Sequence, residues 1–396
     1  MRTQVAIIGG GPAGMFLAHL LGRAGIESVI LERRSRDYVE GRVRAGVLDR
    51  ITVETMERLG LDARLRREGL PHAGTTILFD GEACPIDFKA LTGSLVTVYG
   101  QSEVMKDVFD AAEERDLRIV FEADDVRLND VASERPYVTY RKDGAILRID
   151  CDFIAGCDGS HGISHSAIPK ETVKTFERHY PFGWLGILAE VPPHPELIYC
   201  NHENGFALAS MRSTHRSRCY LQCGLDEDLD DWTDDRFWDE FVRRLGPEAG
   251  AHVTRGSTFE KGIIPLHSFV AEPMQYGRLF LLGDAAHIVP PTGAKGMNLA
   301  VSDAVMLSEA LEEFTSSGSQ TALNAYSARA LTRVWKAERF SWWLTGLTHR
   351  FPEHGPMERR LQRAEFDYLR QSRAARTAFA ENYVGLPLNG FATCLS

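Results

Sequence analysis

Cysteine is scarce in this sequence. The 396-residue chain contains seven cysteines, and no two of them form a CxxC pair. The odd number and the spacing argue against a disulfide framework and against a zinc site. We therefore expect reduced thiols, a cytoplasmic location and no structural metal.

The chain also lacks a long membrane-spanning run and an excess of basic residues. Residues 5–22 carry no formal charge, but they include five glycines and Pro12, which suit a turn better than a membrane helix. A net charge of −10 argues against a nucleic-acid surface. With 44% hydrophobic and 25% charged residues, the composition is that of a soluble globular protein. We expect neither a nucleic acid nor a membrane among its partners.

The first residues follow the order of a dinucleotide-binding unit. An apolar strand at 4–8 precedes GGGPAG at 9–14, an apolar helix, and a second strand that ends at Glu32. In this arrangement Gly9 permits the tight turn, Gly11 lets the backbone approach a pyrophosphate, and Gly14 allows close packing of helix and strand. Glu32 is placed to bind a ribose. The alternative is a glycine-rich turn that binds nothing, and the motif alone does not separate NAD from FAD.

Two later segments favour a flavin. DFIAGCDGSHGIS begins at residue 152, and a strand ends at Gly283-Asp284 before PPTGAKGMN opens a long helix. Asp284 could hold polyol hydroxyls, and the N–H groups of Gly296, Met297 and Asn298 could face the electron-rich edge of the ring. Lys295 would add positive charge there. An ordinary prolyl loop and helix cap would explain the prolines but not the ordered set of segments.

A cationic hairpin is predicted at 205–223. Alternation places Ser210 and Arg212 of one strand beside Arg218 and Tyr220 of the next, on one face. This face looks either at water or at a buried anion. A buried guanidinium requires a partner, and a carboxylate supplies paired, charge-assisted hydrogen bonds.

The ordered segments resemble those of the class A flavoprotein aromatic hydroxylases, and within that family the group that hydroxylates 4-hydroxybenzoate. The resemblance covers nearly the whole chain, through QVAIIGGGPAG, GRVRAGVL, CDFIAGCDGSHGIS, ELIYCNH, SRCYLQ, AAHIVPPTGAKGMN and ENYVGLP. It implies an α/β fold, α+β overall. A Rossmann-like FAD-binding domain would span 1–175, with a small β excursion around 73–98. A β-sheet substrate domain would span 176–270, and a flavin-completing segment and C-terminal helical region 271–396.

The resemblance implies that 4-hydroxybenzoate, O2 and NAD(P)H yield 3,4-dihydroxybenzoate and water through a flavin C4a-hydroperoxide. Arg212 would grip the substrate carboxylate, with Ser210 and Tyr220 completing its hydrogen bonds. Tyr199 and Tyr383 would carry the phenol proton towards His72. The carbonyl of Pro291 would lie over the reactive carbon, and Arg218 would take part in flavin movement. Lys295 would place a positive charge at the ring, and Asn298 would hold the helix start.

The implied cofactor contacts come from several segments. For FAD they are Gly9, Gly11, Ala13, Gly14, Glu32, Arg42, Val43, Arg44, Ala45, Gly46, Val47, Gln101, Asp158, Asp284, Gly296, Met297 and Asn298. For the nicotinamide coenzyme they are Arg33, Arg34, Tyr38, His161 and His267. The basic residues favour NADPH over NADH, although His165 and His267 stand where the family would place arginine. Exposed aromatic stripes on the C-terminal helices suit a homodimer, or else simple core packing.

Three rivals remain. The same chemistry could act on a 3-hydroxybenzoate or an already dihydroxylated acid. A flavin halogenase or reductase could share the FAD fold, although the WxWxIP stretch of tryptophan-type halogenases is absent. A non-catalytic dinucleotide-sensing module is the third.

Overall fold

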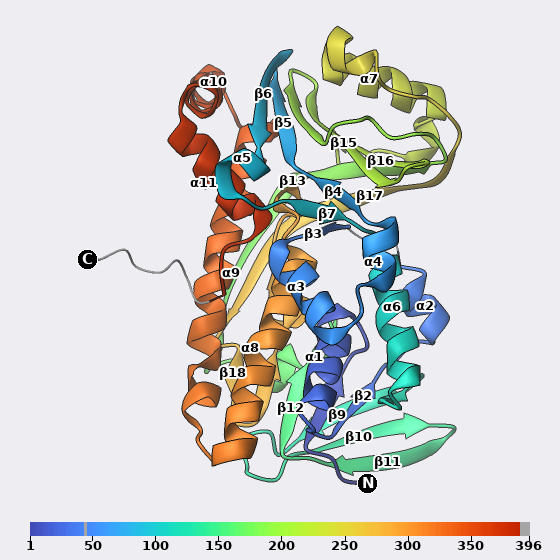
Figure 1. The fold of residues 1–396 in the computed structure, drawn as a ribbon, viewed down its shortest axis with the longest axis vertical. Helices are drawn as coiled ribbons and strands as arrows, with labels where there is room; N and C mark the ends of the chain where they lie inside the picture. The colour runs from blue at the N-terminus through green and yellow to red at the C-terminus, as the bar shows by residue number, and fades with distance from the viewer. Residues whose placement is uncertain (43–45, 389–396) are drawn as a thin grey trace, which may run out of the picture.

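A computed structural model describes residues 1–42 and 46–388, and it confirms a mixed α/β fold (Figure 1). A six-stranded sheet forms the dinucleotide-binding half. Its order is β18 (Gln275–Tyr276), β19 (Leu279–Leu281), β12 (Phe153–Gly156), β1 (Val5–Ile8), β2 (Ser28–Leu31) and β8 (Arg118–Val120). All strands but β18 run parallel. β1 and β12 are buried along their whole length, as the continuous apolar runs of a parallel sheet require.

An eight-stranded sheet forms the other half. Its order is β20 (His287–Ile288), β17 (Thr258–Glu272), β13 (Lys174–Ala189), β16 (Arg216–Cys223), β15 (Gly205–Ser213), β14 (Ile198–His202), β5 (Gly74–Phe79) and β6 (Glu82–Asp87). The excursion predicted around 73–98 thus supplies β5 and β6 to this sheet. The predicted domain boundaries at 175 and 270 fall inside the long strands β13 and β17, and that division stays a prediction.

Two smaller sheets complete the β-structure. One contains β11 (Ala145–Asp150), β10 (Tyr137–Lys142) and β9 (Asp124–Asn129), beside the N-terminus in Figure 1. The other contains β3 (Val47–Leu48), β7 (Val96–Val98) and β4 (Leu70–His72).

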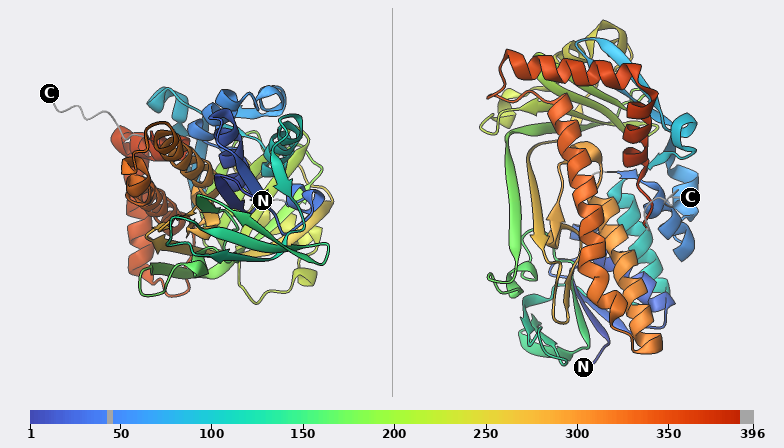
Figure 2. Two further views of the ribbon diagram at one scale, coloured as in Figure 1. Left: turned by 90° about the horizontal axis from the view of Figure 1, so that it is seen from below. Right: turned by 90° about the vertical axis from the view of Figure 1, so that its left-hand side faces the viewer.

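Helices cover the sheets and connect the two halves. They are α1 (Pro12–Arg23), α2 (Arg36–Glu40), α3 (Arg50–Leu59), α4 (Ala63–Glu68), α5 (Phe88–Thr92), α6 (Gln101–Glu114), α7 (Asp234–Gly250), α8 (Gly296–Ser317), α9 (Thr321–Thr348), α10 (Pro356–Gln371) and α11 (Arg373–Val384). α1 packs against α8, which itself packs against α9. In the right-hand view of Figure 2, α9, α10 and α11 face the viewer along one side of the molecule.

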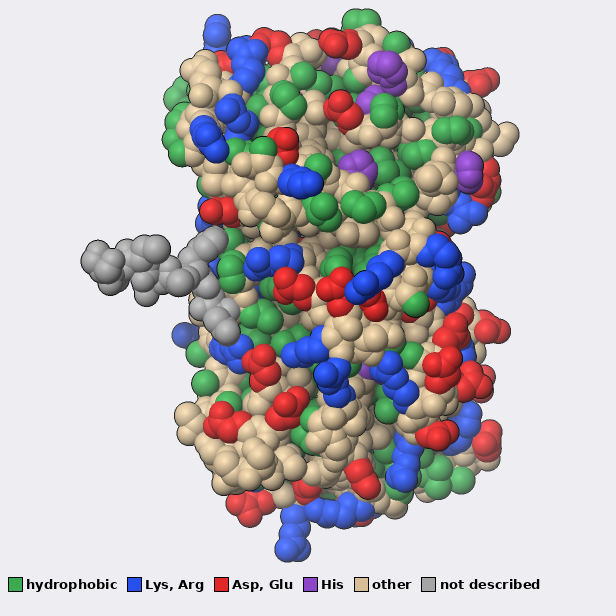
Figure 3. All heavy atoms as spheres, viewed as in Figure 1, with side chains coloured by type: hydrophobic (Ala, Val, Ile, Leu, Met, Phe, Trp, Pro, Cys, Tyr) green, Lys and Arg blue, Asp and Glu red, His purple; other side chains and the backbone are tan. Residues whose placement is uncertain are grey.

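The surface charge and the helices can be compared with the expectation that neither a nucleic acid nor a membrane is a partner. The face in Figure 3 intermixes basic and acidic side chains. Within residues 1–42 and 46–388, no helix is both long enough and apolar enough to cross a membrane.

Candidate active site

The glycine-rich turn after β1 has the geometry that its sequence predicts. Gly9 has a positive φ of 104°, and a Cβ there would lie 2.4 Å from the carbonyl oxygen of Cys157. A Cβ on Gly14 would lie 2.1 Å from the carbonyl oxygen of Gly9, so the turn excludes larger residues. At Gly11 a Cβ would meet nothing within 4 Å, which leaves the backbone at the start of α1 open to a ligand. Ala13, two residues further and inside α1, is buried.

Glu32, the acidic residue that follows β2, is held in place by two backbone N–H groups. Its Oε2 accepts a hydrogen bond from the N–H of Gly10 at 2.7 Å, and its Oε1 accepts one from the N–H of Arg34 at 2.8 Å. Each carboxylate oxygen can accept a second hydrogen bond. Glu32 is therefore held beside the turn with acceptor capacity left for hydroxyl groups.

The other two flavin segments meet this turn. Gly283, which follows β19, has a φ of 58°, and its Cβ position lies 3.4 Å from Ala13 and 3.1 Å from Ala300 of α8. Asp284 beside it is exposed. The glycine-rich turn thus contacts both other flavin segments, through Cys157 in one and Gly283 in the other. The exposed carboxylate of Asp284 lies next to this contact.

Asp158 has a structural task that the sequence did not reveal. Its Oδ2 accepts hydrogen bonds from the N–H groups of Ile163 at 2.7 Å and Ser164 at 3.0 Å, which closes the loop after β12. Burial raises the pKa of this carboxyl group. Its Oδ1 is buried and accepts no hydrogen bond from the described residues, so it is available to a bound hydroxyl.

Asn298 binds two parts of the site together. Its Oδ1 accepts hydrogen bonds from the N–H of Asp49 at 3.0 Å and the hydroxyl of Thr52 at 2.7 Å. Its Nδ2 donates to the carbonyls of Val47 at 3.0 Å and Ala294 at 2.8 Å. The start of α8 is therefore tied to β3 and α3, as expected of a residue that holds the helix start.

The remaining predicted FAD contacts lie around this joint. Arg42 is exposed, Gly46 is buried, and Gln101 is half-buried at the start of α6, as is Gly296 at the start of α8, while Met297 beside it is buried. Val43, Arg44 and Ala45 lie outside the described residues. The start of α1 is open to a ligand, Glu32 and Asp158 can accept further hydrogen bonds, and Asn298 fixes the start of α8. Together these residues form a cradle that fits FAD.

The predicted hairpin is confirmed. β15 and β16 pair antiparallel with Ser210 opposite Arg218, and the turn at Thr214 and His215 is exposed. The register shifts between Met211 and Ser213, so Arg212 sits on a bulge, which re-aims its side chain. A Cβ on Gly46 would lie 2.2 Å from Nη1 of Arg212, so this guanidinium lies against the segment before β3. Ser210 donates its hydroxyl proton to the carbonyl of Arg218 at 2.8 Å.

Arg218 and Tyr220 form the centre of a charged cluster with Arg212. Nε of Arg218 donates to the hydroxyl of Tyr220 at 3.0 Å, and Tyr220 also favours the charged form of Arg212. Nη1 of Arg218 lies 2.9 Å from Oε1 of Glu260. Burial lowers the pKa of Arg212. Burial also disfavours the charged form of Arg218. Its contacts with Tyr220 and Glu260 outweigh this effect, so the pKa of Arg218 is raised.

Two tyrosines form the opposite end of the candidate site. The hydroxyls of Tyr199 in β14 and Tyr383 in α11 are 2.7 Å apart and both side chains are buried. Burial raises the pKa of both hydroxyls, so both are protonated at neutral pH. Tyr199, Leu208 and Tyr220 are register partners across β14, β15 and β16, which places them in one row on the same face of the sheet. The tyrosine pair and the arginine cluster thus lie a few residues apart on one surface.

His72 lies at the end of β4, half-buried, with Nε2 2.7 Å from the sulfur of Met211. Burial lowers its pKa. Among the described residues, no direct hydrogen bond joins it to Tyr199 or Tyr383. Its place in a proton path therefore stays a prediction.

Lys295 and Pro291 make contacts that the sequence did not predict. Nζ of Lys295 donates to the backbone carbonyl of Tyr383 at 2.7 Å, and burial lowers the pKa of this ammonium to about 8. The carbonyl of Pro291 accepts a backbone hydrogen bond from Ala294 at 2.9 Å, which leaves its second lone pair for a ligand.

The predicted coenzyme residues remain accessible. Arg33, Arg34 and Tyr38 are exposed, with the Arg34 guanidinium 5.0 Å from the centre of the Tyr38 ring. His161 is exposed, and the ring of His267 stacks on that of His179 at 5.7 Å. Burial lowers the pKa of His267, and the neighbouring His179 adds to this effect.

Sequence reasoning missed several residues that pair with the predicted site residues or support them. His287 lies 2.6 Å from Asp303, whose Oδ2 also accepts the N–H of Gly283, and this pair supports the turn that carries Asp284. Glu260 was missed because it reaches Arg218 from a strand two positions away. His287 stands in the same GDAAH segment that drew attention to Asp284, and that proximity was the available signal.

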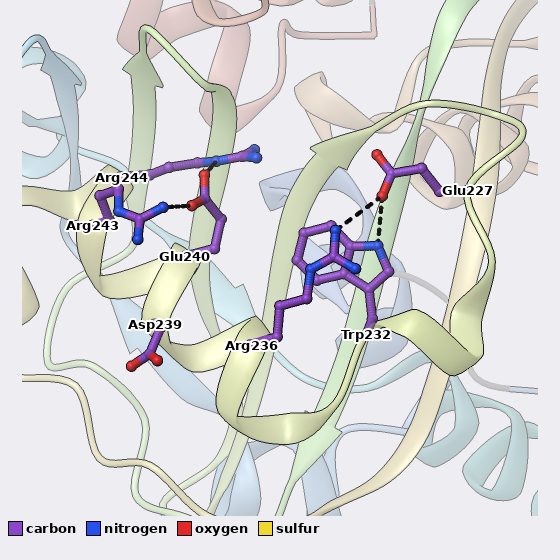
Figure 4. Close-up of a pocket in the computed structure, with 7 residues that line it drawn as sticks. All are labelled: Glu227, Trp232, Arg236, Asp239, Glu240, Arg243 and Arg244. Atoms are coloured by element: carbon purple, nitrogen blue, oxygen red, sulfur yellow. Dashed lines mark hydrogen bonds and ion pairs between the residues drawn. The ribbon is translucent and has the colours of Figure 1, made fainter.

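A separate surface groove of about 660 Å³ runs beside α7 (Figure 4). Arg236, Arg243 and Arg244 line it, but Figure 4 shows them already paired with Glu227 and Glu240. Trp232 likewise donates its ring N–H to Glu227 at 2.7 Å. With its charges balanced internally, this groove is not the candidate active site.

Comparison with known proteins places this geometry in a family. The family model described as an FAD binding domain matches residues 2–341. The chain is 52% identical over 389 residues to p-hydroxybenzoate hydroxylase of Acinetobacter baylyi, which covers 98% of this chain and 96% of that protein. It is 26% identical over 318 residues, 77% of this chain, to 3-(3-hydroxy-phenyl)propionate/3-hydroxycinnamic acid hydroxylase of Mycobacterium sp. strain JLS, and spans 53% of that protein.

A solved structure confirms the fold. The crystal structure of p-nitrophenol 4-monooxygenase PnpA from Pseudomonas putida DLL-E4 superposes with a TM-score of 0.80 at 20% identity, covering 99% of this chain and 100% of that one. The matches over nearly the full length, together with the FAD cradle, establish the family. This chain belongs to the FAD-dependent aromatic hydroxylases, the flavoprotein monooxygenase family that includes p-hydroxybenzoate hydroxylase.

Proposed function

We propose that this protein hydroxylates 4-hydroxybenzoate at the 3-position, consuming O2 and NAD(P)H and releasing 3,4-dihydroxybenzoate and water. One observation carries the proposal: the half-buried Arg212 and the buried Arg218 lie on the same face of the eight-stranded sheet as a buried pair of tyrosine hydroxyls. A rigid acid with a carboxylate at one end and a phenol at the other matches both. The 52% identity to p-hydroxybenzoate hydroxylase of Acinetobacter baylyi supports the same substrate.

Arg212 binds the carboxylate in this proposal. Its guanidinium can donate two parallel hydrogen bonds to a carboxylate, and from the bulge in β15 it reaches Gly46 before β3. The hydroxyl of Tyr220 lies in the same cluster, and Ser210, whose proton goes to the carbonyl of Arg218, lies beside it. These contacts orient the ring, and the carbonyl of Pro291 faces its reactive carbon.

The tyrosine pair handles the phenol proton. A phenol titrates near pH ~10, so activation of the ring at neutral pH requires a hydrogen-bonded site for the departing proton. The hydroxyl of Tyr199 receives that proton and passes its own to Tyr383, because the two oxygens are 2.7 Å apart. His72, neutral at pH 7 because burial lowers its pKa, accepts the proton at the outer end.

Bound FAD supplies electron transfer from the coenzyme and activation of oxygen. Gly9, Gly11 and Gly14 let the backbone approach its pyrophosphate, Glu32 binds its ribose, and Asp158 and Asp284 bind further hydroxyls. The start of α8 holds the edge of the ring through its backbone N–H groups. The exposed Arg33, Arg34 and Tyr38 bind the coenzyme, with NADPH preferred over NADH, and His161 and His267 contact its nicotinamide half.

We also propose a cytoplasmic homodimer. The described cysteines are all unpaired, as in a reducing compartment. Large apolar side chains stay exposed on the two neighbouring C-terminal helices, with 49% exposure at Trp342 of α9 and 56% and 58% at Leu361 and Tyr368 of α10. Light scattering coupled to size-exclusion chromatography would measure the mass, and a monomer at micromolar concentration would contradict the dimer.

Product analysis tests the proposed activity. The purified FAD-loaded protein is mixed with NADPH or NADH and with 4-hydroxybenzoate, 3-hydroxybenzoate or 3,4-dihydroxybenzoate, and products are identified by mass and retention time. We expect 3,4-dihydroxybenzoate from the para isomer, faster coenzyme oxidation in its presence, and a higher rate with NADPH. Turnover of another isomer without turnover of 4-hydroxybenzoate would instead support a neighbouring substrate.

A further inference from the structure

His349, the residue that follows α9, is a completely buried histidine to which the proposed function gives no role. Its imidazole ring stacks on the ring of Phe206 in β15, with the ring centres 4.2 Å apart and an angle of 18° between the planes. Its Nε2 accepts a hydrogen bond from the indole N–H of Trp184 in β13 at 2.7 Å. His349 therefore contacts two aromatic side chains of the eight-stranded sheet.

The hydrogen bond from Trp184 fixes the tautomer of His349. An indole N–H can only donate, so Nε2 carries no proton and the imidazole proton lies on Nδ1. Nδ1 lies 3.1 Å from the carbonyl oxygen of Thr345 and 3.0 Å from the hydroxyl oxygen of Thr348, and both oxygens can accept. Burial lowers the pKa of His349 to about 3, so the ring is neutral near pH 7. The imidazole thus connects the end of α9 to the side chain of Trp184.

Trp184 and Phe206 lie between the two ends of the candidate site. The centre of the Trp184 ring is 4.9 Å from that of Tyr220 and 4.9 Å from that of Phe206. The Phe206 ring in turn lies 6.2 Å from the ring of Tyr199. All four residues belong to one buried hydrophobic cluster. A continuous aromatic layer, formed by Tyr220, Trp184, Phe206 and Tyr199, therefore joins the arginine end of the site to the tyrosine end.

We infer that His349 is a positioning and specificity-determining residue, whose hydrogen bond with Trp184 sets the spacing between the two ends of the site. The inference rests on the proposed function, in which Tyr220 lies at the carboxylate end of one rigid acid and Tyr199 at its phenol end. Without an acceptor at position 349, the indole N–H would be buried without a partner, so the ring would turn to find one. Tyr220 would then lose its support, and the site would discriminate less sharply between acids of different length.

His349→Phe keeps a flat ring beside Phe206 but removes the acceptor. Titration of the FAD-loaded protein with 4-hydroxybenzoate and with 4-hydroxyphenylacetate, which is one methylene longer, measures both affinities and their ratio. We expect 4-hydroxybenzoate to bind about five- to tenfold more weakly, and the preference for it over the longer acid to fall at least about threefold. His349→Leu, which also lacks an acceptor, takes its place if His349→Phe does not fold.

His349→Gln separates the hydrogen bond from packing. Its amide oxygen can accept the indole N–H and its amide nitrogen can donate to the carbonyl of Thr345, whereas the stacked ring is lost. We expect this variant to keep the wild-type preference within about twofold, even if its melting temperature falls. An equal loss of preference in His349→Gln and His349→Phe would assign the effect to packing and overturn the inference.

Trp184→Phe removes the same hydrogen bond from the donor side. It should reduce the preference as well, and because one hydrogen bond joins the two residues, the double variant with His349→Phe should be hardly worse than the more impaired single variant. Trp238→Phe is the matched control. Its buried indole N–H donates to the carbonyl of Gly256 at 2.7 Å, in the hydrophobic cluster on the other face of the sheet. This control should keep both affinities at wild-type values.

The outcomes distinguish the inference from the proposed function. If the wild type neither binds nor hydroxylates 4-hydroxybenzoate, the proposed function fails and the inference fails with it. If the wild type does both but His349→Phe keeps the wild-type preference, with or without a lower melting temperature, only the inference is overturned. Additive losses in the double variant, or an equal loss in Trp238→Phe, would also overturn it. Loss of preference in His349→Phe together with its retention in His349→Gln supports the inference.

Discussion

The two ends of the candidate active site are built from opposite chemistry. At one end Arg218 hydrogen-bonds Tyr220 and pairs with Glu260, and Arg212 of the same hairpin adds a third formal charge. At the other, Tyr199 and Tyr383 share a hydrogen bond of 2.7 Å without any formal charge of their own. A buried ion retains its charge only with a partner, whereas a buried hydroxyl needs only one hydrogen bond.

In the proposed function, this difference separates substrate binding from proton transfer. The charged end favours an anion and discriminates by electrostatics, so changes there should alter affinity. At the hydroxyl end burial raises the pKa of both tyrosines, which keeps them protonated and able to exchange protons along the pair. Changes there should leave affinity nearly intact and reduce the fraction of turnovers that give product.

Arg212→Lys should have the largest effect. An ammonium cannot reproduce the two parallel hydrogen bonds of a guanidinium, and we expect about 100- to 1000-fold weaker binding of 4-hydroxybenzoate, on the order of 3–4 kcal/mol. Titration followed by the flavin absorbance would measure it. Arg216→Lys, on the exposed turn side of the same hairpin, is the control and should bind normally. Wild-type affinity in Arg212→Lys would remove the carboxylate from this end of the site.

Tyr199→Phe should have the second largest effect, on yield rather than affinity. The ring remains in place, so binding should change less than about threefold, while product per NAD(P)H should fall about tenfold or more and hydrogen peroxide should appear instead. Tyr383→Phe should act in the same direction. Because one hydrogen bond joins the two residues, the double variant should be hardly worse than the more impaired single variant. Additive losses would mean that the two hydroxyls act separately.

Lys295 links the hydroxyl end to pH. Burial lowers its pKa to about 8, below the usual lysine value, so between about pH 8 and pH 10 the unfolded chain binds one more proton than the folded chain. The free energy of unfolding should therefore rise with pH, by up to about 1.4 kcal/mol per unit, relative to Lys295→Met. Denaturant unfolding of both proteins across this range would measure the difference. If the free energy of unfolding of both proteins changed equally with pH, burial would not lower the pKa of Lys295.

The sequence predicted the dinucleotide-binding half better than the substrate side. β1, the glycine-rich turn, α1 and β2 are consecutive, and each needs only local backbone rules and apolar periodicity. The hairpin that carries Ser210 and Arg218 was likewise predictable, because its strands alternate and its turn is short.

Contacts between distant segments could not be read from local patterns. Tyr199 and Tyr383 are 184 residues apart, and only the resemblance to a family paired them. No local rule predicts that Glu260 of β17 reaches Arg218 of β16, which lies two strands away in the sheet. Nor does one predict that Asp158 accepts hydrogen bonds from the N–H groups of Ile163 and Ser164. Such partners depend on strand order and loop closure, which tertiary packing decides.

Ser210→Ala should have the smallest effect, although Ser210 belongs to the charged end. Its hydroxyl proton is already donated to the carbonyl of Arg218 at 2.8 Å, so only its lone pairs face the site, and a carboxylate cannot donate to them. We therefore expect binding of 4-hydroxybenzoate to weaken less than about threefold, because the carboxylate depends on Arg212. The same titration would measure this change, with Ser213→Ala nearer the turn as control. A loss above about tenfold would mean that the hydroxyl turns to donate to the substrate, and that the charged end binds it through neutral donors as much as through charge.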